Sequence, residues 1–279
     1  MTDFLATVNA HPRDAAVHFV EQGHTYHVDG DPSPQTPYTS VTTLNHANFK
    51  QFDADAIIAG MMAKSSWCEG NKYWGMTAQE IKDMWSASGA AASALGTEMH
   101  ANIELFMNNS ARAIRQTTPP SLTHTTPDHN TVEWQHFIAF VEDHPDLVPY
   151  RTEWVVYHEE LKIAGSIDMV CENPDGTLTI YDWKRTKQID PTNRWRKFAI
   201  NPVIAHIPDT NYWHYAIQLN SYKAILEEKY GKTVSALALA RLHPDAATYE
   251  VIPMPDLQKE IREMWNERKE KLGNVTINK

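Results

Sequence analysis

The sequence has only two cysteines and no long apolar run in its 279 residues. Cys68 and Cys171 are too few for a disulfide framework, a four-cysteine zinc site or a cysteine-ligated iron–sulfur cluster. No segment approaches the roughly 20 apolar residues of a membrane helix, and residues 1–20 lack the basic-then-apolar pattern of a secretory signal. We therefore expect a chain of the reducing cytoplasm, without an iron–sulfur cluster and without a membrane partner.

Positive charge is also scarce. The chain carries 25 basic and 35 acidic residues, a formal net charge of −10, which argues against coating nucleic acid by bulk attraction. The balance does not exclude an enzyme of nucleic acids, because such an enzyme needs basic residues only along the path of the strand. The sequence also has no G-x-x-x-x-G-K-[ST] loop, so we expect no nucleotide cofactor and no helicase motor. Its 14 histidines show neither zinc-peptidase spacing, H-E-x-x-H or H-x-x-E-H.

The composition that remains is ordinary for a globular protein, with 42% apolar and 22% charged residues. The segments before and after the threonine- and proline-rich stretch at about 110–131 do not look able to fold as separate domains. We therefore expect one domain over residues 1–279, with that stretch as an exposed loop. Residues 1–95 would form a β and helical N-terminal addition, and residues 96–279 would form the core.

Hydrophobic periodicity predicts an α/β fold with a mixed central β-sheet flanked by helices. The first 50 residues read as β and turn. Helices are predicted at 52–65, at 76–109 with a break near Gly89 or Gly96, at 132–144, from about 211 to Gly231, and at 255–273. Strands are predicted at 151–160, 161–172, 177–184, 233–242 and 247–254.

One predicted hairpin places two carboxylates and a lysine close together. Asp168 lies inside an otherwise apolar strand, where an ionised carboxylate is costly unless something compensates its charge. Asp182 and Lys184 share one face near the end of the next strand. Two carboxylates and a lysine suit a divalent cation such as Mg²⁺ and metal-assisted phosphodiester hydrolysis. The alternative is that Asp168 caps a loop and the other two form a surface ion pair.

The register of this hairpin tests the metal hypothesis. A strict four-residue loop at 173–176 would pair Glu172 with Thr177 and put Asp168 opposite Tyr181. Asp182 would then point to the wrong face. A shared metal site therefore predicts a different loop register, a bulge or a strong bend in one strand.

The pattern Asp168, then Asp182-Trp183-Lys184, resembles the PD-(D/E)XK nuclease superfamily. Its signature is an acid in one strand followed by (D/E)-x-K in the next. The resemblance implies a restriction-endonuclease-like core. Because the signature is short, its specificity depends on the motifs beside it.

Two helical motifs flank the hairpin. GTEMHANIELF places His100 and Glu104 four residues apart on one helix face, and HYAIQLNSYKAIL does the same for Gln218 and Tyr222. Each motif alone is compatible with ordinary packing. In this order, however, they resemble the RecB-like branch, which has G-x-x-x-H, the acid, D-x-K and then Q-x-x-x-Y.

That resemblance implies roles for the matching residues. The implied metal ligands are His100, Asp168, Asp182 and the backbone carbonyl of Trp183. Lys184 would be catalytic, and Gln218 and Tyr222 would support the site or touch DNA. Glu153 matches an acid often found in the preceding strand, and Glu104 is a weaker candidate for support.

The layout is similar to viral, phage and mitochondrial exonucleases of this branch. It implies a DNA exonuclease that uses Mg²⁺ or Mn²⁺ on single strands or duplex ends. The implied setting is replication, repair or recombination beside a partner protein, in the cytoplasm of a bacterial host if a phage or prophage encodes the chain. Two alternatives stay open: a non-catalytic adaptor that binds nucleic acid on the same fold, and a structure- or sequence-specific endonuclease.

Basic residues follow directly on the predicted catalytic strand. Five of them could neutralise backbone phosphates on the way to the metal, and one tryptophan among them could stack on a base. These candidates are Arg185, Lys187, Arg194, Trp195, Arg196 and Lys197. The alternative is a solvated loop with ordinary salt bridges.

Overall fold

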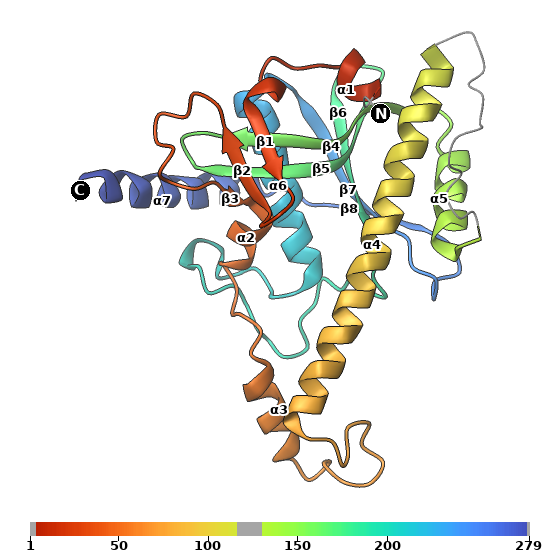
Figure 1. Ribbon diagram of the computed structural model, residues 1–279, viewed down its shortest axis with the longest axis vertical. Coiled ribbons are helices and arrows are strands. Elements are labelled where there is room, and N and C mark those ends of the chain that lie inside the picture. The colour runs from red at the N-terminus through yellow and green to blue at the C-terminus, as the bar shows by residue number, and fades with distance from the viewer. Residues whose placement is uncertain (1–3, 116–129, 278–279) are drawn as a thin grey trace.

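The computed structural model describes residues 4–115 and 130–277, which form a mixed sheet between two layers of helices (Figure 1). The strands of the sheet are β3 (Thr39–Ser40), β4 (Val148–His158), β5 (Ile163–Glu172), β6 (Leu178–Lys184), β7 (Val234–Arg241) and β8 (Glu250–Pro253). Their order is β3-β5-β6-β7-β8, and β4 pairs with β5. β3–β5 and β6–β7 are parallel, and the other pairs are antiparallel. The predicted α/β class is confirmed.

The sheet splits at β5. β4 follows β5 along one edge from residue 163 to residue 172. β3 pairs with residues 163–164 and β6 with residues 169–172, so both use the opposite edge, at its two ends. In the described chain, residues 165–168 have no ladder partner on that edge. Asp168 lies at the end of this gap, where the β6 ladder stops at residue 169.

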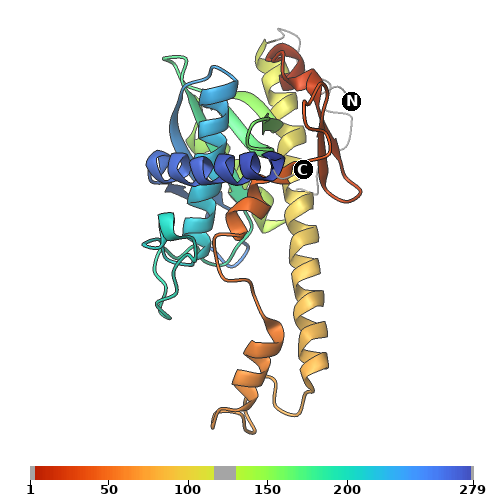
Figure 2. The same ribbon diagram turned by 90° about the vertical axis from the view of Figure 1, so that its left-hand side faces the viewer.

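Each face of the sheet carries its own apolar core. One core joins the strands to α2 (Val41–His46), α6 (Asn211–Lys229) and α7 (Gln258–Ile277). The other joins them to α4 (Ala78–Arg115) and α5 (Val132–Asp143). Figure 2 shows α7 crossing over α6, with α4 running along the length of the molecule.

The N-terminal segment contains more helix than the sequence predicts. It comprises α1 (Phe4–Val8), the 3₁₀ turn η1 (Asp14–Ala16), a hairpin of β1 (Val17–Val20) and β2 (Thr25–Val28), then β3 and α2. α2 follows directly on β3, and the Ser40 side chain caps it by accepting from the Thr43 amide. A second 3₁₀ turn, η2 (Pro202–Ile204), lies in the segment before α6.

α4 is a single helix of 38 residues, so the predicted break at Gly89 or Gly96 is wrong. An added Cβ at either glycine would meet nothing within 4 Å, and a glycine without a competing structure weakens a helix without ending it. The helix continues to residue 115, which also corrects the predicted loop at 110–131. Residues 116–129 of that loop lie outside the described residues.

The first part of α4 and α3 (Ala54–Met62) form an arm that projects away from the sheet (Figures 1 and 2). Aromatic rings join its tip: Tyr73 lies 6.0 Å from Trp85, and Trp67 lies 6.0 Å from Trp74. Nearly all of residues 86–98 of α4 are exposed to solvent. No described helix combines the length and apolar character needed to cross a membrane.

Candidate active site

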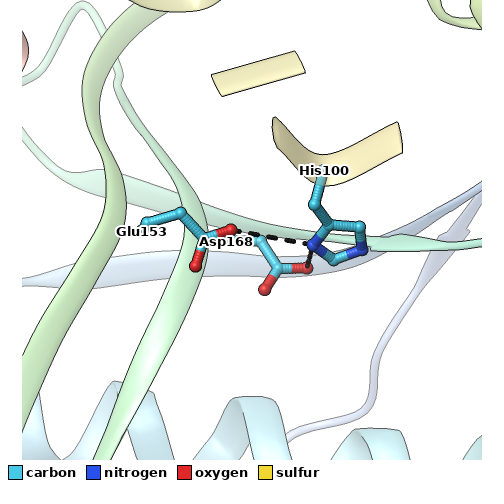
Figure 3. Close-up of side chains that lie close together, drawn as sticks. All are labelled: His100, Glu153 and Asp168. Atoms are coloured by element: carbon cyan, nitrogen blue, oxygen red, sulfur yellow. Dashed lines mark ion pairs between the residues drawn. The ribbon is translucent and has the colours of Figure 1, made fainter. Parts of the chain in front are cut away.

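Three elements bring together an imidazole and two carboxylates (Figure 3). His100 comes from α4, Glu153 from β4 and Asp168 from β5. His100 Nδ1 lies 3.7 Å from Glu153 Oε1 and 3.5 Å from Asp168 Oδ2. One potential ligand atom of each residue lies within 4.8 Å of the others. A single small cation could contact all three.

The β5–β6 hairpin has the register that a shared site requires. Glu172 pairs with Leu178, and the ladder runs back to the pair Met169–Tyr181. The Asn173 amide donates to the Thr177 carbonyl, which closes a loop one residue longer than the strict four. Asp168 and Asp182 are therefore the next positions opposite each other, and the predicted change of loop register is confirmed.

Backbone groups of Trp183 hold the imidazole and one carboxylate. The Trp183 amide donates to Asp168 Oδ2 at 3.0 Å, and its carbonyl lies 3.0 Å from His100 Nε2. A histidine that ligates a metal through one nitrogen usually donates from the other to such an acceptor. The carbonyl therefore orients His100 so that Nδ1 faces the carboxylates. Its further role as a metal ligand stays a prediction.

Glu153 occupies an unusual backbone position. Its neighbours in β4 pair with residues 169 and 167 of β5, so Glu153 stands opposite Asp168. Its φ is +40°, a conformation that is uncommon and costly outside glycine. The Ser166 hydroxyl donates to Glu153 Oε2 at 2.8 Å and fixes the side chain. This strained residue therefore presents its carboxylate directly to His100.

Asp182 lies beside this group and not within it. Its carboxylate is 3% exposed and forms an ion pair with Lys184 Nζ at 2.5 Å. The same ammonium lies 4.8 Å from the centre of the Tyr215 ring. The Lys184 ammonium thus contacts both a carboxylate and an aromatic ring. The role of Asp182 as a metal ligand stays a prediction.

The charges of the site depend on one another. Burial lowers the pKa of His100, but attraction by Asp168 and a hydrogen bond with Glu153 outweigh it and raise that pKa to about 9. Burial, followed by repulsion from Asp182, raises the pKa of Asp168 to about 7. Burial lowers the pKa of Lys184, and the two aspartates raise it above its usual value.

These crowded carboxylates, with an imidazolium between two of them, fit a divalent cation. The cation would replace the proton on His100 and offset the repulsion that disfavours the charge of Asp168.

The Q-x-x-x-Y motif lies against the same strands. The Tyr222 side chain is 3% exposed, and burial raises the pKa of its hydroxyl well above the usual value, while a hydrogen bond with Gln218 lowers it. The negative charges of Asp168 and Asp182 also raise the pKa of Tyr222. It packs on Gly165, where an added Cβ would come within 2.7 Å of the Tyr222 oxygen. Glycine is therefore required at this point of β5.

The predicted basic residues divide into two sets. Arg185 forms an ion pair with Glu133 and Lys187 one with Asp245. Trp195 is 80% exposed. The three basic residues around it are exposed too: Arg194, Arg196 and Lys197.

Glu104 is not in the three-residue group, among the described residues. Sequence reasoning missed Ser166 and Tyr215. Tyr215 had a readable signal, since it lies three residues before Gln218 on the same helix face. Ser166 had none that separates it from any other strand serine.

Comparison with known proteins identifies the family. The family profile of the PD-(D/E)XK nuclease superfamily matches residues 73–276. A search of curated proteins gives no match. Among the similar solved structures, two are each 13% identical to this chain. One, from Eubacterium rectale, is provisionally named an exonuclease (TM-score 0.37, 66% of this chain and 66% of that one, just under two thirds). The other is SSO0001 (TM-score 0.25, 47% and 54%). From the profile match, the chain belongs to the PD-(D/E)XK nuclease superfamily.

Proposed function

We propose that this protein is a metal-dependent DNA exonuclease of the RecB-like branch. The observation that carries the proposal is the group of His100, Glu153 and Asp168 beside the Asp182–Lys184 pair. Nucleases of this superfamily generally use divalent metal ions. An imidazole and two carboxylates within reach of one point are suitable protein ligands for Mg²⁺ or Mn²⁺.

The protein groups would divide the work as follows. His100, Glu153 and Asp168 would hold the cation, with Asp182 and the Trp183 carbonyl as further candidates. When bound, such an ion polarises the phosphate and lowers the pKa of a water molecule. Lys184, held by Asp182, would position the attacking water or donate to a phosphate oxygen. Water adds to phosphorus, and the bond from phosphorus to the leaving oxygen breaks.

Several features support a nucleic acid as the substrate, and we infer DNA from the resemblance to the RecB-like branch. Tyr222 is buried and hydrogen-bonds Gln218, so this pair could support the site but is not placed to touch the strand. The exposed residues 194–197 combine three positive charges with an aromatic ring, as expected where phosphates and bases pass. We infer single strands or duplex ends as the form, and replication, repair or recombination as the setting, beside a partner protein.

The test uses end-labelled single-stranded and linear duplex DNA with Mg²⁺, Mn²⁺ or EDTA. We expect the wild type to release mononucleotides or short oligonucleotides only with metal. Lys184→Ala should lose at least about a hundredfold in rate, in the range typical of a lost acid–base or electrostatic group. Lys271→Ala, an exposed lysine on α7, is the matched control and should cleave like the wild type.

Three outcomes would contradict the proposal. Cleavage that persists in EDTA would exclude metal dependence. Equal cleavage by Lys184→Ala would exclude this site. Cleavage of covalently closed circles as fast as linear DNA would replace the exonuclease with an endonuclease.

A further inference from the structure

The β1–β2 hairpin lies over the sheet beside the candidate active site. β1 contacts β4, and β2 contacts β3. Because β4 and β3 pair with opposite edges of β5, the hairpin crosses over β5. Figure 1 shows it passing in front of β4 and β5. The N-terminal segment therefore covers the two strands that carry the carboxylates of the three-residue group.

Tyr26 lies on the face of the hairpin that turns toward the sheet. Side chains alternate along a strand, and Tyr26 and Val28 are less exposed than Thr25 and His27 on the other face. Phe19, the cross-strand partner of Tyr26, packs against it with ring centres 5.0 Å apart. The hairpin thus fixes the position of the Tyr26 ring by itself.

The Tyr26 hydroxyl lies within electrostatic reach of the active site. Burial raises the pKa of Tyr26, and the negative charge of Glu153 raises it further. After burial and the charge of Asp168, Tyr26 in turn raises the pKa of Tyr222, which packs on Gly165. The phenol therefore stands beside both strands, β4 and β5, at the position of the candidate metal ligands.

This hydroxyl is available to a substrate. No hydrogen bond holds it within the part of the chain that the structure describes. Tyr26 is only half-buried, and the neighbouring Glu153 side chain keeps 34% of its surface exposed. A phenol whose pKa is raised stays protonated at neutral pH, so it can donate a hydrogen bond.

A phosphodiester needs such a donor at this site. The site contains three carboxylates, and its lysine already forms an ion pair with Asp182. A phosphate oxygen accepts hydrogen bonds, and an uncharged hydroxyl supplies one without a further ion pair.

We propose that Tyr26 binds the substrate by donating its hydroxyl to a non-bridging oxygen of the phosphate at the active site. Phe19 holds the ring in position for this contact. The inference rests on the proposed function and deepens it with a residue that lies outside the stretch matching the family profile, 73–276. The N-terminal hairpin thereby becomes part of the substrate site.

The first test measures cleavage of a single-stranded oligothymidylate by the full chain in Mn²⁺. Tyr26→Phe removes only the hydroxyl and should lower kcat/KM about tenfold, as expected for one lost hydrogen bond to a charged group. Tyr38→Phe is the matched control. Its hydroxyl also lacks a partner in the described chain, and the charges that act on it come from Asp31, Glu159 and Arg13. This control should cleave like the wild type.

The second test needs no cleavage. In EDTA, Tyr26→Phe should bind fluorescein-labelled oligothymidylate about threefold to tenfold more weakly than the wild type, whereas Tyr38→Phe should bind equally well. Tyr26→Phe should keep the melting temperature of the wild type and its rise with Mn²⁺, because the ring stays on Phe19 and the proposed metal ligands are intact.

The inference would be overturned if Tyr26→Phe both cleaved and bound like the wild type, or if Tyr38→Phe lost as much. Loss of the Mn²⁺ response in Tyr26→Phe would also overturn it, since the tyrosine would then act through Glu153 and not on the substrate. The proposed nuclease fails separately, if the wild type does not cleave with metal. In that case weaker binding by Tyr26→Phe would still support the contact, and equal binding would contradict it.

Discussion

The Tyr215 ring lies 4.8 Å from the predicted catalytic ammonium of Lys184, which also forms an ion pair with Asp182. A cation over an aromatic face is attracted by the ring and not by a substituent on it. The contribution of Tyr215 should therefore depend on its ring, while its hydroxyl should matter little.

We expect Tyr215→Leu to lower kcat about tenfold with little change in KM, because Lys184 loses one of its two supports. Tyr215→Phe should stay within about twofold of the wild type. Steady-state kinetics on a single-stranded oligonucleotide would measure both. A purely structural role would instead make the phenylalanine and leucine variants equally harmless, or lower the folded fraction of both.

The Asp168 carboxylate is electrostatically unfavourable at the position of the proposed metal site. Its surroundings disfavour its charge, chiefly through burial and the nearby Asp182. Asp168→Asn removes that charge but keeps an oxygen that can accept from the Trp183 amide. Without metal, we expect its melting temperature to exceed that of the wild type by about 2–4 °C.

Millimolar Mn²⁺ should raise the melting temperature of the wild type and not that of Asp168→Asn. Differential scanning fluorimetry with and without Mn²⁺ measures both effects. An unchanged Mn²⁺ response in the variant would remove Asp168 from the proposed ligands.

At the scale of single residues, part of the candidate site can be predicted from the sequence and part cannot. His100 and Asp168 follow from motif spacing, and the structure places them together. The backbone position of Glu153 cannot be predicted in this way, because a φ of +40° depends on the strands beside it and leaves no sequence pattern.

At the scale of elements, a shift of one residue in the β5–β6 hairpin decides whether Asp182 lies on the same face as Asp168 or on the opposite face. The turn residues at 173–176 predict a reversal of the chain, but they fit loops of more than one length. Because side chains alternate along a strand, one residue of register decides whether Asp182 faces Asp168. The cross-strand bonds that set this register form only in the folded sheet.

The predicted helix break near Gly89 or Gly96 is wrong because local sequence does not determine where a packed helix ends. Glycine raises the free energy of a helix by roughly 1 kcal/mol per residue, which can mark an end but does not dictate one. Packing of both ends of α4, one on the sheet and one on α3, keeps the helix continuous through Gly89 and Gly96.

We expect Gly165→Ala to destabilise the fold by about 2 kcal/mol, because its Cβ would overlap the Tyr222 ring. Gly89→Ala is the control, since its Cβ meets nothing within 4 Å, and it should stabilise α4 by up to about 1 kcal/mol. Urea unfolding measures both. Equal effects of the two substitutions would show that the close approach of Tyr222 is not a constraint.

At the scale of the whole molecule, an ion pair ties the N-terminal segment to the sheet. Arg13 Nη2 lies 2.6 Å from Glu159 Oε2, and the guanidinium also covers the Tyr157 ring at 4.0 Å. Burial raises the pKa of Glu159, but the hydrogen bond and the charge of Arg13 outweigh it and lower that pKa to about 2.

This ion pair predicts a pH dependence of stability. The depressed pKa means that the unfolded chain binds more protons than the folded one between about pH 2 and pH 4.5, so the contribution of Glu159 is lost as the pH falls through that window. Above about pH 5, the free energy of unfolding of the wild type should exceed that of Glu159→Gln by on the order of 1 kcal/mol, allowing for solvent screening. The difference should vanish near pH 2. Unfolding free energies measured across this range check it, and a difference independent of pH would contradict it.

The exposed middle of α4 has a consequence for what this helix can do besides carrying His100. Residues 86–95 contain only serine, alanine, glycine and one leucine, with no charge. Their backbone donors and acceptors lie within a continuous helix. Such a surface offers a ligand no charge and only one large apolar side chain. This stretch therefore serves as a spacer that holds the arm away from the sheet, and not as a binding surface.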